Sequence, residues 1–206
     1  MSKATIEEKR LPKGGASLRQ SVTEAIRAAV LAALVEEGHA RMSMDSVARR
    51  AGVGKAALYR RWTSKLSMIT EVIRDSVGDS LLRVPETGAL SSDVRELLVL
   101  FREELRDPRL RRIVADLIGE STRNEALYDM FDESIAKPRR LAVQGMLRAA
   151  IERGELPEDL DLEMAVDLLI APVAFRLILL RDPMDDDRLE ALARSVSAGL
   201  AARTAA

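Results

Sequence analysis

The sequence contains no cysteine and a single histidine, His39. The lack of cysteine excludes a disulfide framework, a thiolate zinc site and a cysteine nucleophile. One histidine cannot supply an imidazole triad or a two-histidine metal site within one subunit. Carboxylate pairs such as Glu103 and Glu104 fall on helix faces that we predict to be solvated. We therefore expect no metal, no cofactor and no catalytic site, and interpret the chain as a protein other than an enzyme.

Long apolar segments are also missing. The longest uninterrupted apolar run, LLIAPVAF at 168–175, is far shorter than the roughly 20 residues that a membrane-spanning helix needs. The N-terminal segment MSKATIEEKRLPKGG lacks the apolar stretch of a signal peptide. We therefore expect a cytoplasmic protein without a membrane partner.

Strand-forming patterns are scarce, because β-branched and aromatic residues do not alternate with polar ones. Apolar residues nevertheless make up 47% of the 206 positions, enough for a packed core. Residues 1–66 hold 13 Lys and Arg against 6 Asp and Glu, whereas residues 67–206 hold 19 against 27. We predict an all-α fold with a basic N-terminal head that binds a polyanion and an acidic body that does not.

Apolar residues at helical spacing predict about nine helices. The predicted ranges are 18–37, 44–51, 55–62 and 65–82 in the first part, then 92–106, 108–119, 123–153, 161–181 and 186–203. Gly38 ends the first helix and Gly52 turns the chain between the second and third. Pro138 and Pro172 fall inside predicted helices, where we expect kinks. The predicted units are an arm at 1–16, a head at 17–77 and a body at 78–206.

The stretch AGVGKAALYRRWTSK, residues 51–65, contains a Gly-Lys step that could end a nucleotide-phosphate loop. Such a loop needs G-x-x-x-x-G-K-[ST], but Arg49 occupies the first glycine position and Ala56 follows the lysine. The order long helix, short helix, glycine turn, short helix instead predicts a helix-turn-helix, whose last helix enters the major groove of DNA. The spacing therefore favours double-stranded DNA over a nucleotide.

Helical spacing separates two faces of the predicted third helix. Leu58 and Trp62 face inward, and Lys55 at the helix start can reach guanine. We expect Arg61 and Lys65 to clamp backbone phosphates. The predicted DNA-contacting residues are Ser43, Met44, Lys55, Ala56, Ala57, Tyr59, Arg60, Arg61 and Lys65.

Residues 43–65, SMDSVARRAGVGKAALYRRWTSK, resemble the DNA-binding signature of the TetR family of bacterial repressors. The resemblance covers about residues 17–77 and includes the A-G-V turn, the L-Y step and the S-K pair that opens the fourth helix. It implies a homodimer that binds a roughly palindromic operator, associates with the nucleoid when bound, and releases DNA when a small effector binds the body. Many members have Ser at the position of Gly54, so we expect a weaker helix cap here.

The predicted helix at 161–181 is apolar on nearly every side in its second half, which predicts burial against the home core and a second subunit. The last predicted helix adds a second apolar stripe, and two helices from each subunit would form a four-helix contact. A central helix buried in a monomer is the alternative. The predicted interface residues are Leu162, Val166, Leu169, Ile170, Val173, Leu177, Leu189, Leu192, Val196 and Leu200.

Aromatic residues and Met on separate body helices are candidate pocket liners, although the same residues also suit an ordinary core. The candidates are Phe101, Leu105, Leu117, Tyr128, Phe131, Met146, Phe175 and Arg176. We expect a mostly apolar effector. Two other functions stay open: a helical small-molecule binding protein or enzyme with a vestigial head, and a DNA-binding protein that responds to no ligand.

Overall fold

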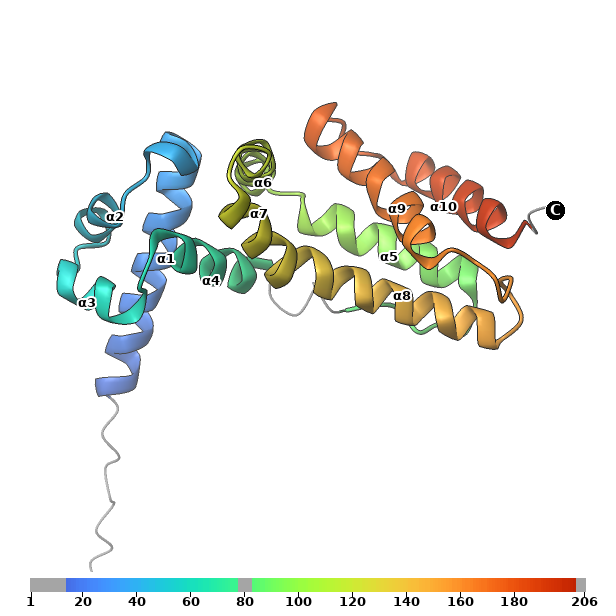
Figure 1. Cartoon of the computed structure of the whole chain (residues 1–206), viewed down its shortest axis with the longest axis horizontal. Helices are drawn as coiled ribbons and strands as arrows, with labels where there is room; N and C mark the ends of the chain where they lie inside the picture. The colour runs from blue at the N-terminus through green and yellow to red at the C-terminus, as the bar shows by residue number, and fades with distance from the viewer. Residues whose placement is uncertain (1–13, 78–82, 203–206) are drawn as a thin grey trace, which may run out of the picture.

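The computed structural model describes residues 14–77 and 83–202, and within these ranges the chain contains helices and no strand (Figure 1). The head contains α1 (Gly14–Arg41), α2 (Met44–Ala51), α3 (Lys55–Arg61) and α4 (Lys65–Val77). The body contains α5 (Leu90–Glu104), α6 (Pro108–Ser121), α7 (Glu125–Phe131), the π-helical η2 (Asp132–Ala136), α8 (Lys137–Glu152), α9 (Leu162–Ala174), the π-helical η3 (Phe175–Leu179) and α10 (Asp186–Ala201). The predicted all-α fold is confirmed.

The described helices form nine rods, because η2 joins α7 to α8 and η3 continues α9. The predicted arm falls outside the described residues as far as residue 13, and so does the predicted end of the fourth helix at 78–82. Within the described ranges, no helix has the length and apolar character that crossing a lipid bilayer requires.

The rods form an elongated molecule with the head at one end (Figure 1). The body helices α5, α8, α9 and α10 lie at the other end, and α6 lies between the two parts (Figure 1). The head core includes Leu58 and Trp62, and it continues into Ile113 and Leu117 of α6 and Leu127 of α7. The body helix α6 is therefore packed directly against the head.

Gly38 interrupts α1, as the sequence predicted for the end of the first helix. Its backbone lies at φ 75 and ψ 167, a left-handed φ that glycine adopts without steric cost. Asp116 of α6 approaches this break so closely that a Cβ added at Gly38 would lie 3.2 Å from its Oδ1. Glycine at this position therefore permits both the break in α1 and the approach of α6.

Hydrogen bonds to the backbone of His39 join α1, α4 and α6 beside this break. The carboxylate of Asp116 accepts from the His39 N–H at 2.7 Å, and Lys65 Nζ donates to the His39 carbonyl oxygen at 2.8 Å. The His39 side chain is buried, and its Nδ1 has no hydrogen-bond partner among the described residues. Burial, together with the charge of Lys65, lowers the pKa of His39.

This lowered pKa makes stability depend on pH. Below about pH 6.5 the unfolded chain binds a proton at His39 that the folded chain resists, so the free energy of unfolding falls as pH decreases. The slope contributed by His39 is at most about 1.4 kcal/mol per pH unit. Urea unfolding between about pH 7.5 and pH 5.5 should show this loss in wild type and a smaller one in His39→Phe. Equal pH dependence in the two proteins would contradict this account of His39.

The body has its own core between α5, α8, α9 and α10. All ten residues predicted to form the dimer interface belong to this core. Val166, Leu169, Val173, Leu177, Leu189 and Leu200 are buried, and Leu162, Ile170, Leu192 and Val196 are half-buried against them. The six buried residues face their own core, whereas a contact of the four half-buried residues with a second subunit stays a prediction. Because α9 is apolar on several sides, its spacing did not reveal which side faces its own core.

The two prolines inside predicted helices lie next to the π-helical segments. Pro138 follows η2 in the first turn of α8, and Pro172 lies in α9 shortly before η3. Proline cannot donate a backbone hydrogen bond, and π-helical turns are a common way for a helix to accommodate such an interruption. The sequence predicted an irregularity at each proline, but not its π-helical form.

Candidate nucleic-acid interface

The outer face of α3 consists of side chains that point away from the head core. Lys55, Ala56, Tyr59 and Arg60 are exposed, whereas Leu58 is fully buried. At 3.6 residues per turn, the four exposed positions share one side of the helix. The predicted inner and outer faces therefore agree with the observed exposure.

The turn that presents α3 is fixed by backbone geometry. Ser43 and Ser46 cap α2 reciprocally: the Ser46 N–H donates to Ser43 Oγ at 3.1 Å, and the Ser43 N–H donates to Ser46 Oγ at 3.3 Å. Gly52 ends α2 in the left-handed region at φ 67. Gly54 begins α3 without a side-chain cap, as expected. The predicted contact residue Met44 is buried, so its side chain supports α2 and does not reach the surface.

Lys55 is held by a carboxylate of the preceding helix. Its Nζ donates to Asp45 Oδ2 at 2.5 Å, while 60% of its side chain stays exposed. The hydrogen bond from Lys55 lowers the pKa of Asp45, with a smaller contribution from Tyr59. Because exposed ion pairs contribute little free energy, Lys55 can exchange Asp45 for a base edge or a phosphate at small cost.

Arg61 lies on the other side of α3, where it supports the helix. It donates to Thr23 Oγ1 at 2.8 Å and to Glu71 Oε1 at 2.7 Å, and its guanidinium stacks on the ring of Trp62. Lys65 is half-buried and bonded to His39. The structure therefore places two predicted phosphate clamps in contacts within the head.

Two arginines on the head are free to contact a ligand. The side chains of Arg60 and Arg49 are exposed and make no hydrogen bond or ion pair among the described residues. Arg49 was not among the predicted DNA-contacting residues. Its neighbour Arg50 pairs with Glu36 and Glu37 of α1, and nothing in the sequence shows which of the two arginines makes that contact.

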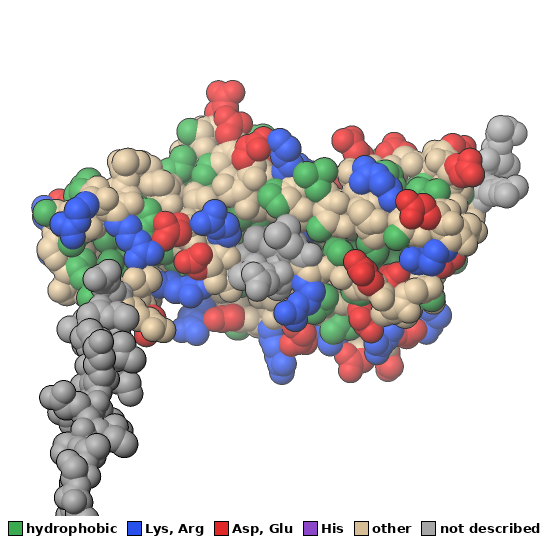
Figure 2. Space-filling view, turned by 90° about the horizontal axis from the view of Figure 1, so that it is seen from below, with side chains coloured by type: hydrophobic (Ala, Val, Ile, Leu, Met, Phe, Trp, Pro, Cys, Tyr) green, Lys and Arg blue, Asp and Glu red, His purple; other side chains and the backbone are tan. Residues whose placement is uncertain are grey.

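Positive charge is also found on the rest of the head surface. Seen from below, several Lys and Arg side chains lie on the end of the molecule that carries the head, together with some acidic ones, and both signs of charge also mix over the body (Figure 2). Ala57, another predicted contact residue, is half-buried and lies beside the exposed arc. Together, the exposed side chains of α3 and the basic head form a surface suited to the polyanionic major groove.

The eight predicted pocket residues do not surround one cavity. Leu105 and Met146 are buried in the body core, and Leu117 is buried in the head core, which Phe131 also contacts. Tyr128 and Phe175 are exposed at 55% and 52%. Arg176 pairs with Asp182 at 3.0 Å. These candidates lie on separate helices, and spacing along the sequence does not show whether such residues meet at one pocket.

Phe101 does line a small, partly open hollow between α5, α8 and α9. Its space for water-sized groups is about 20 Å³, so the hollow holds no more than a single water molecule in this conformation. Beside it, Arg139 donates to Glu104 and stacks over the Phe101 ring at 4.9 Å. Both charged side chains are largely buried. A larger effector would have to open this part of the core.

Comparison with known families finds one match within the head and another within the body. Residues 26–72 match the model of the bacterial regulatory proteins of the tetR family, and residues 84–196 match the tetracyclin repressor-like C-terminal domain. The HTH-type transcriptional regulator YdeS of Bacillus subtilis is 30% identical over 193 residues, which cover 94% of this chain and 96% of YdeS. The DNA-binding transcriptional repressor TetR of Mycobacteroides abscessus is 31% identical over 79% of this chain and 84% of its own length.

Solved structures agree with this assignment. The TetR family transcription regulator SCO0332 is 30% identical, with a TM-score of 0.67 over 87% of this chain and 98% of that one. FadR of Bacillus subtilis, solved with stearoyl-CoA, shares the fold at 20% identity and a TM-score of 0.71, over 89% of this chain and all of that one. Head, body and full-length relatives lead to one conclusion: this chain belongs to the TetR family of bacterial transcriptional regulators.

Proposed function

We propose that the protein is a repressor that acts in the cytoplasm as a homodimer on a palindromic operator and releases DNA when a small molecule binds the body. The observation that carries this proposal is the exposed arc of α3. Lys55, Tyr59 and Arg60 offer donors to bases and phosphates, and Ala56 lets the backbone approach the groove floor. Ser43, Arg61 and Lys65 hold this arc in place through contacts within the head.

The surface that supports a homodimer is an apolar stripe on the outer side of α9 and η3. Half of the ten large hydrophobic residues that are exposed in the described chain lie here: Met164, Leu168, Phe175, Leu179 and Leu180. Four of them repeat at helical spacing along one face. Single exposed apolar residues are common, but a contiguous stripe of this kind is typical of an interaction surface.

Residues next to this stripe suit its pairing with a second copy. The exposed positions of α10 include Ala191, Ala198 and Gly199, which allow another helix to approach closely. A two-fold axis that runs two copies of α9 antiparallel would place the stripe of each copy against that of the other.

Release of DNA requires a connection between body and head, and α6 supports one. It places Ile113 and Leu117 in the head core and bonds Asp116 to the α1 backbone. A ligand that prefers one position of α6 would shift the head between two states. The stearoyl-CoA complex of the structurally similar FadR supports a small-molecule effector as a general feature of this architecture.

Replacing Arg60 tests the role of α3 in binding DNA. Arg60→Ala should weaken binding to a selected duplex and make the plot of log affinity against log salt concentration less steep by about 0.9, the loss of one phosphate contact. Fluorescence anisotropy over a series of salt concentrations measures this slope. Arg95→Ala, on the body and paired with Glu190, is the matched control and should leave the slope unchanged. Identical slopes for wild type and Arg60→Ala would contradict the contact.

A further inference from the structure

A basic groove lies between α6 and the end of η3. Arg111 and Arg112 of α6 and Arg181, just after η3, border a hollow of about 550 Å³ that no carboxylate lines. A second hollow of about 470 Å³ shares Arg111 with the first. Three guanidinium groups around a space without an acid create a strongly positive local potential.

These three arginines differ from nearly all others in the body. Sixteen arginines lie within residues 83–202, and twelve of them donate a hydrogen bond to an acid, an amide or the backbone. Only the side chains of Arg83, Arg111, Arg112 and Arg181 make no hydrogen bond or ion pair among the described residues. Three of these four arginines surround one groove.

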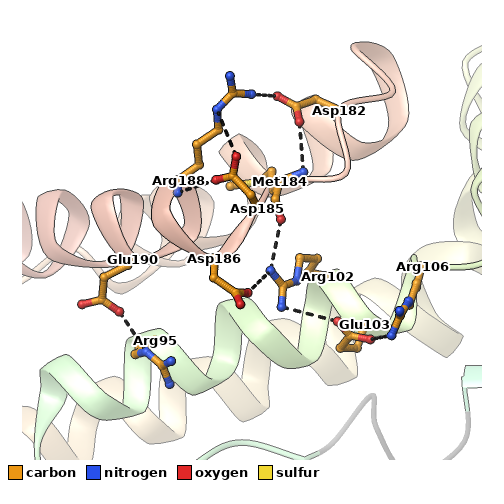
Figure 3. Close-up of polar contacts among 10 residues, drawn as sticks. All are labelled: Arg95, Arg102, Glu103, Arg106, Asp182, Met184, Asp185, Asp186, Arg188 and Glu190. Carbon is orange, nitrogen blue, oxygen red and sulfur yellow. Dashed lines mark hydrogen bonds and ion pairs between the residues drawn. The ribbon is translucent and has the colours of Figure 1, made fainter.

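Asp182, which follows Arg181 along the chain, already has several donors. Asp182 accepts from Arg188 at 2.5 Å and from the backbone of Met184 at 3.0 Å (Figure 3). It also accepts from Arg176 at 3.0 Å. Arg102 bonds Asp186 at 2.7 Å and the Met184 carbonyl at 3.1 Å, which ties the loop to α5 (Figure 3). Because Asp182 and Asp186 are bonded to other residues, the side chain of Arg181 has no carboxylate partner among the described residues.

Backbone strain accompanies this arrangement. Arg181 lies at φ 54, a left-handed conformation that few residues other than glycine adopt. The contacts of Asp182 and Arg102 hold the loop in that conformation. The groove thus combines a fixed loop, a helix and three cations, and no carboxylate is among its lining residues.

The remaining walls of the groove are apolar. Pro108, Ala115, Leu177 and Ile178 complete the lining. We infer that this groove binds a phosphomonoester with a short apolar group, the phosphate held by Arg111, Arg112 and Arg181 and the apolar group lying on Leu177 and Ile178. Guanidinium groups match phosphate oxygens through paired hydrogen bonds, so this ligand supplies the charge that the groove lacks.

Occupation of the groove also gives the proposed repressor a means of control, and this part of the inference rests on the proposed function. Arg112 lies one helical turn from Asp116 on α6, and Asp116 and Leu117 contact the head. A phosphate that draws Arg111 and Arg112 toward Arg181 moves α6 relative to α1. The ligand-bound protein should therefore bind operator DNA more weakly.

Isothermal titration calorimetry of the full chain at one fixed salt concentration tests the site. The probes are hexyl phosphate, inorganic phosphate and hexan-1-ol. Hexyl phosphate should bind most tightly, inorganic phosphate more weakly, and hexan-1-ol not at all. Arg112→Gln and Arg181→Gln should each raise the Kd of hexyl phosphate about tenfold, the loss of a charge-assisted hydrogen bond, whereas Arg112→Lys should lose less.

Arg148→Gln on α8, which bonds only Gln144, is the matched control and should bind hexyl phosphate like wild type. The site would be overturned if wild type does not bind hexyl phosphate, or if both groove variants bind it as tightly as wild type does. Binding of hexan-1-ol as tight as that of hexyl phosphate would also overturn it. Loss of the dimer in the groove variants would likewise overturn it, by assigning these arginines to the subunit interface.

The same proteins separate this inference from the proposed function. Without ligand, wild type and both groove variants should bind a selected duplex equally, and hexyl phosphate should weaken only the wild-type complex. If the protein binds no duplex but still binds hexyl phosphate, the proposed repressor function is refuted and the proposed phosphate site is kept. If DNA binding ignores hexyl phosphate, the control by this groove is refuted.

Discussion

Trp62→Ala should reduce the free energy of unfolding by roughly 3–5 kcal/mol, the usual cost of removing a large buried aromatic side chain. Trp62 is 4% exposed and donates from Nε1 to Glu71 at 2.8 Å. Its loss removes packing under α3 and leaves that acceptor without its donor. Because the head core continues into α6 and α7, the damage should extend beyond the head. Urea unfolding followed by far-UV circular dichroism measures the change.

Trp62→Phe provides the control for this experiment. It keeps most of the buried ring but loses the hydrogen bond to Glu71, so a cost of about 1–2 kcal/mol is expected. The pKa of Glu71 should then rise. Burial already acts to raise it, and hydrogen bonds from Arg61 and Trp62 outweigh that effect and lower it. A Trp62→Ala protein within about 1 kcal/mol of wild type would show that Trp62 does not support the head as described.

Phe175→Glu should separate the proposed dimer into folded monomers. Phe175 is 52% exposed in the middle of the apolar stripe of α9 and η3, where a two-fold axis would bring a new carboxylate near its copy. Loss of an aromatic anchor and burial of a charge should raise the dimer Kd at least about 100-fold. Sedimentation velocity measures this dissociation. Binding to a two-half-site duplex should weaken similarly, because each head then binds alone.

Leu141→Glu is the matched control, since Leu141 is 55% exposed on α8, away from the stripe. It introduces the same charge at an apolar residue of similar exposure and should leave both the dimer and DNA affinity unchanged. Both variants should keep the helical content of wild type. A Phe175→Glu protein with the mass of the wild-type assembly would disprove the proposed interface.

Local sequence signals predicted the head closely, because short-range physics determines it. Gly52, the Ser43 cap and the spacing of Leu58 and Trp62 fix the turn and the inner face of α3 without help from distant residues. The body helices were predicted from apolar spacing and proline positions alone. In these cases each signal and its structural effect lie within a few residues of one another.

Features that depend on distant contacts were predicted poorly. The sequence showed that α9 is apolar on several sides, but burial of Leu169 and exposure of Phe175 depend on where α5 and α8 pack. The hydrogen bond from Lys65 to the backbone of His39 joins residues 26 positions apart, and the spacing around Lys65 gave no sign of it. The same reason explains the candidate pocket: residues on five helices cannot be shown to converge from spacing along one chain.

The central claim is that α3 reads DNA as part of a symmetric dimer. In vitro selection of bound duplexes from a randomised pool, by the wild-type protein, tests it most directly. The account predicts enrichment of a palindrome whose half-sites are centred about one helical turn apart, roughly 10–10.5 base pairs or a multiple of this. The same selection with Arg60→Ala should enrich more weakly. A pool that stays random after repeated selection, or that yields only a single unpaired half-site, would contradict the claim.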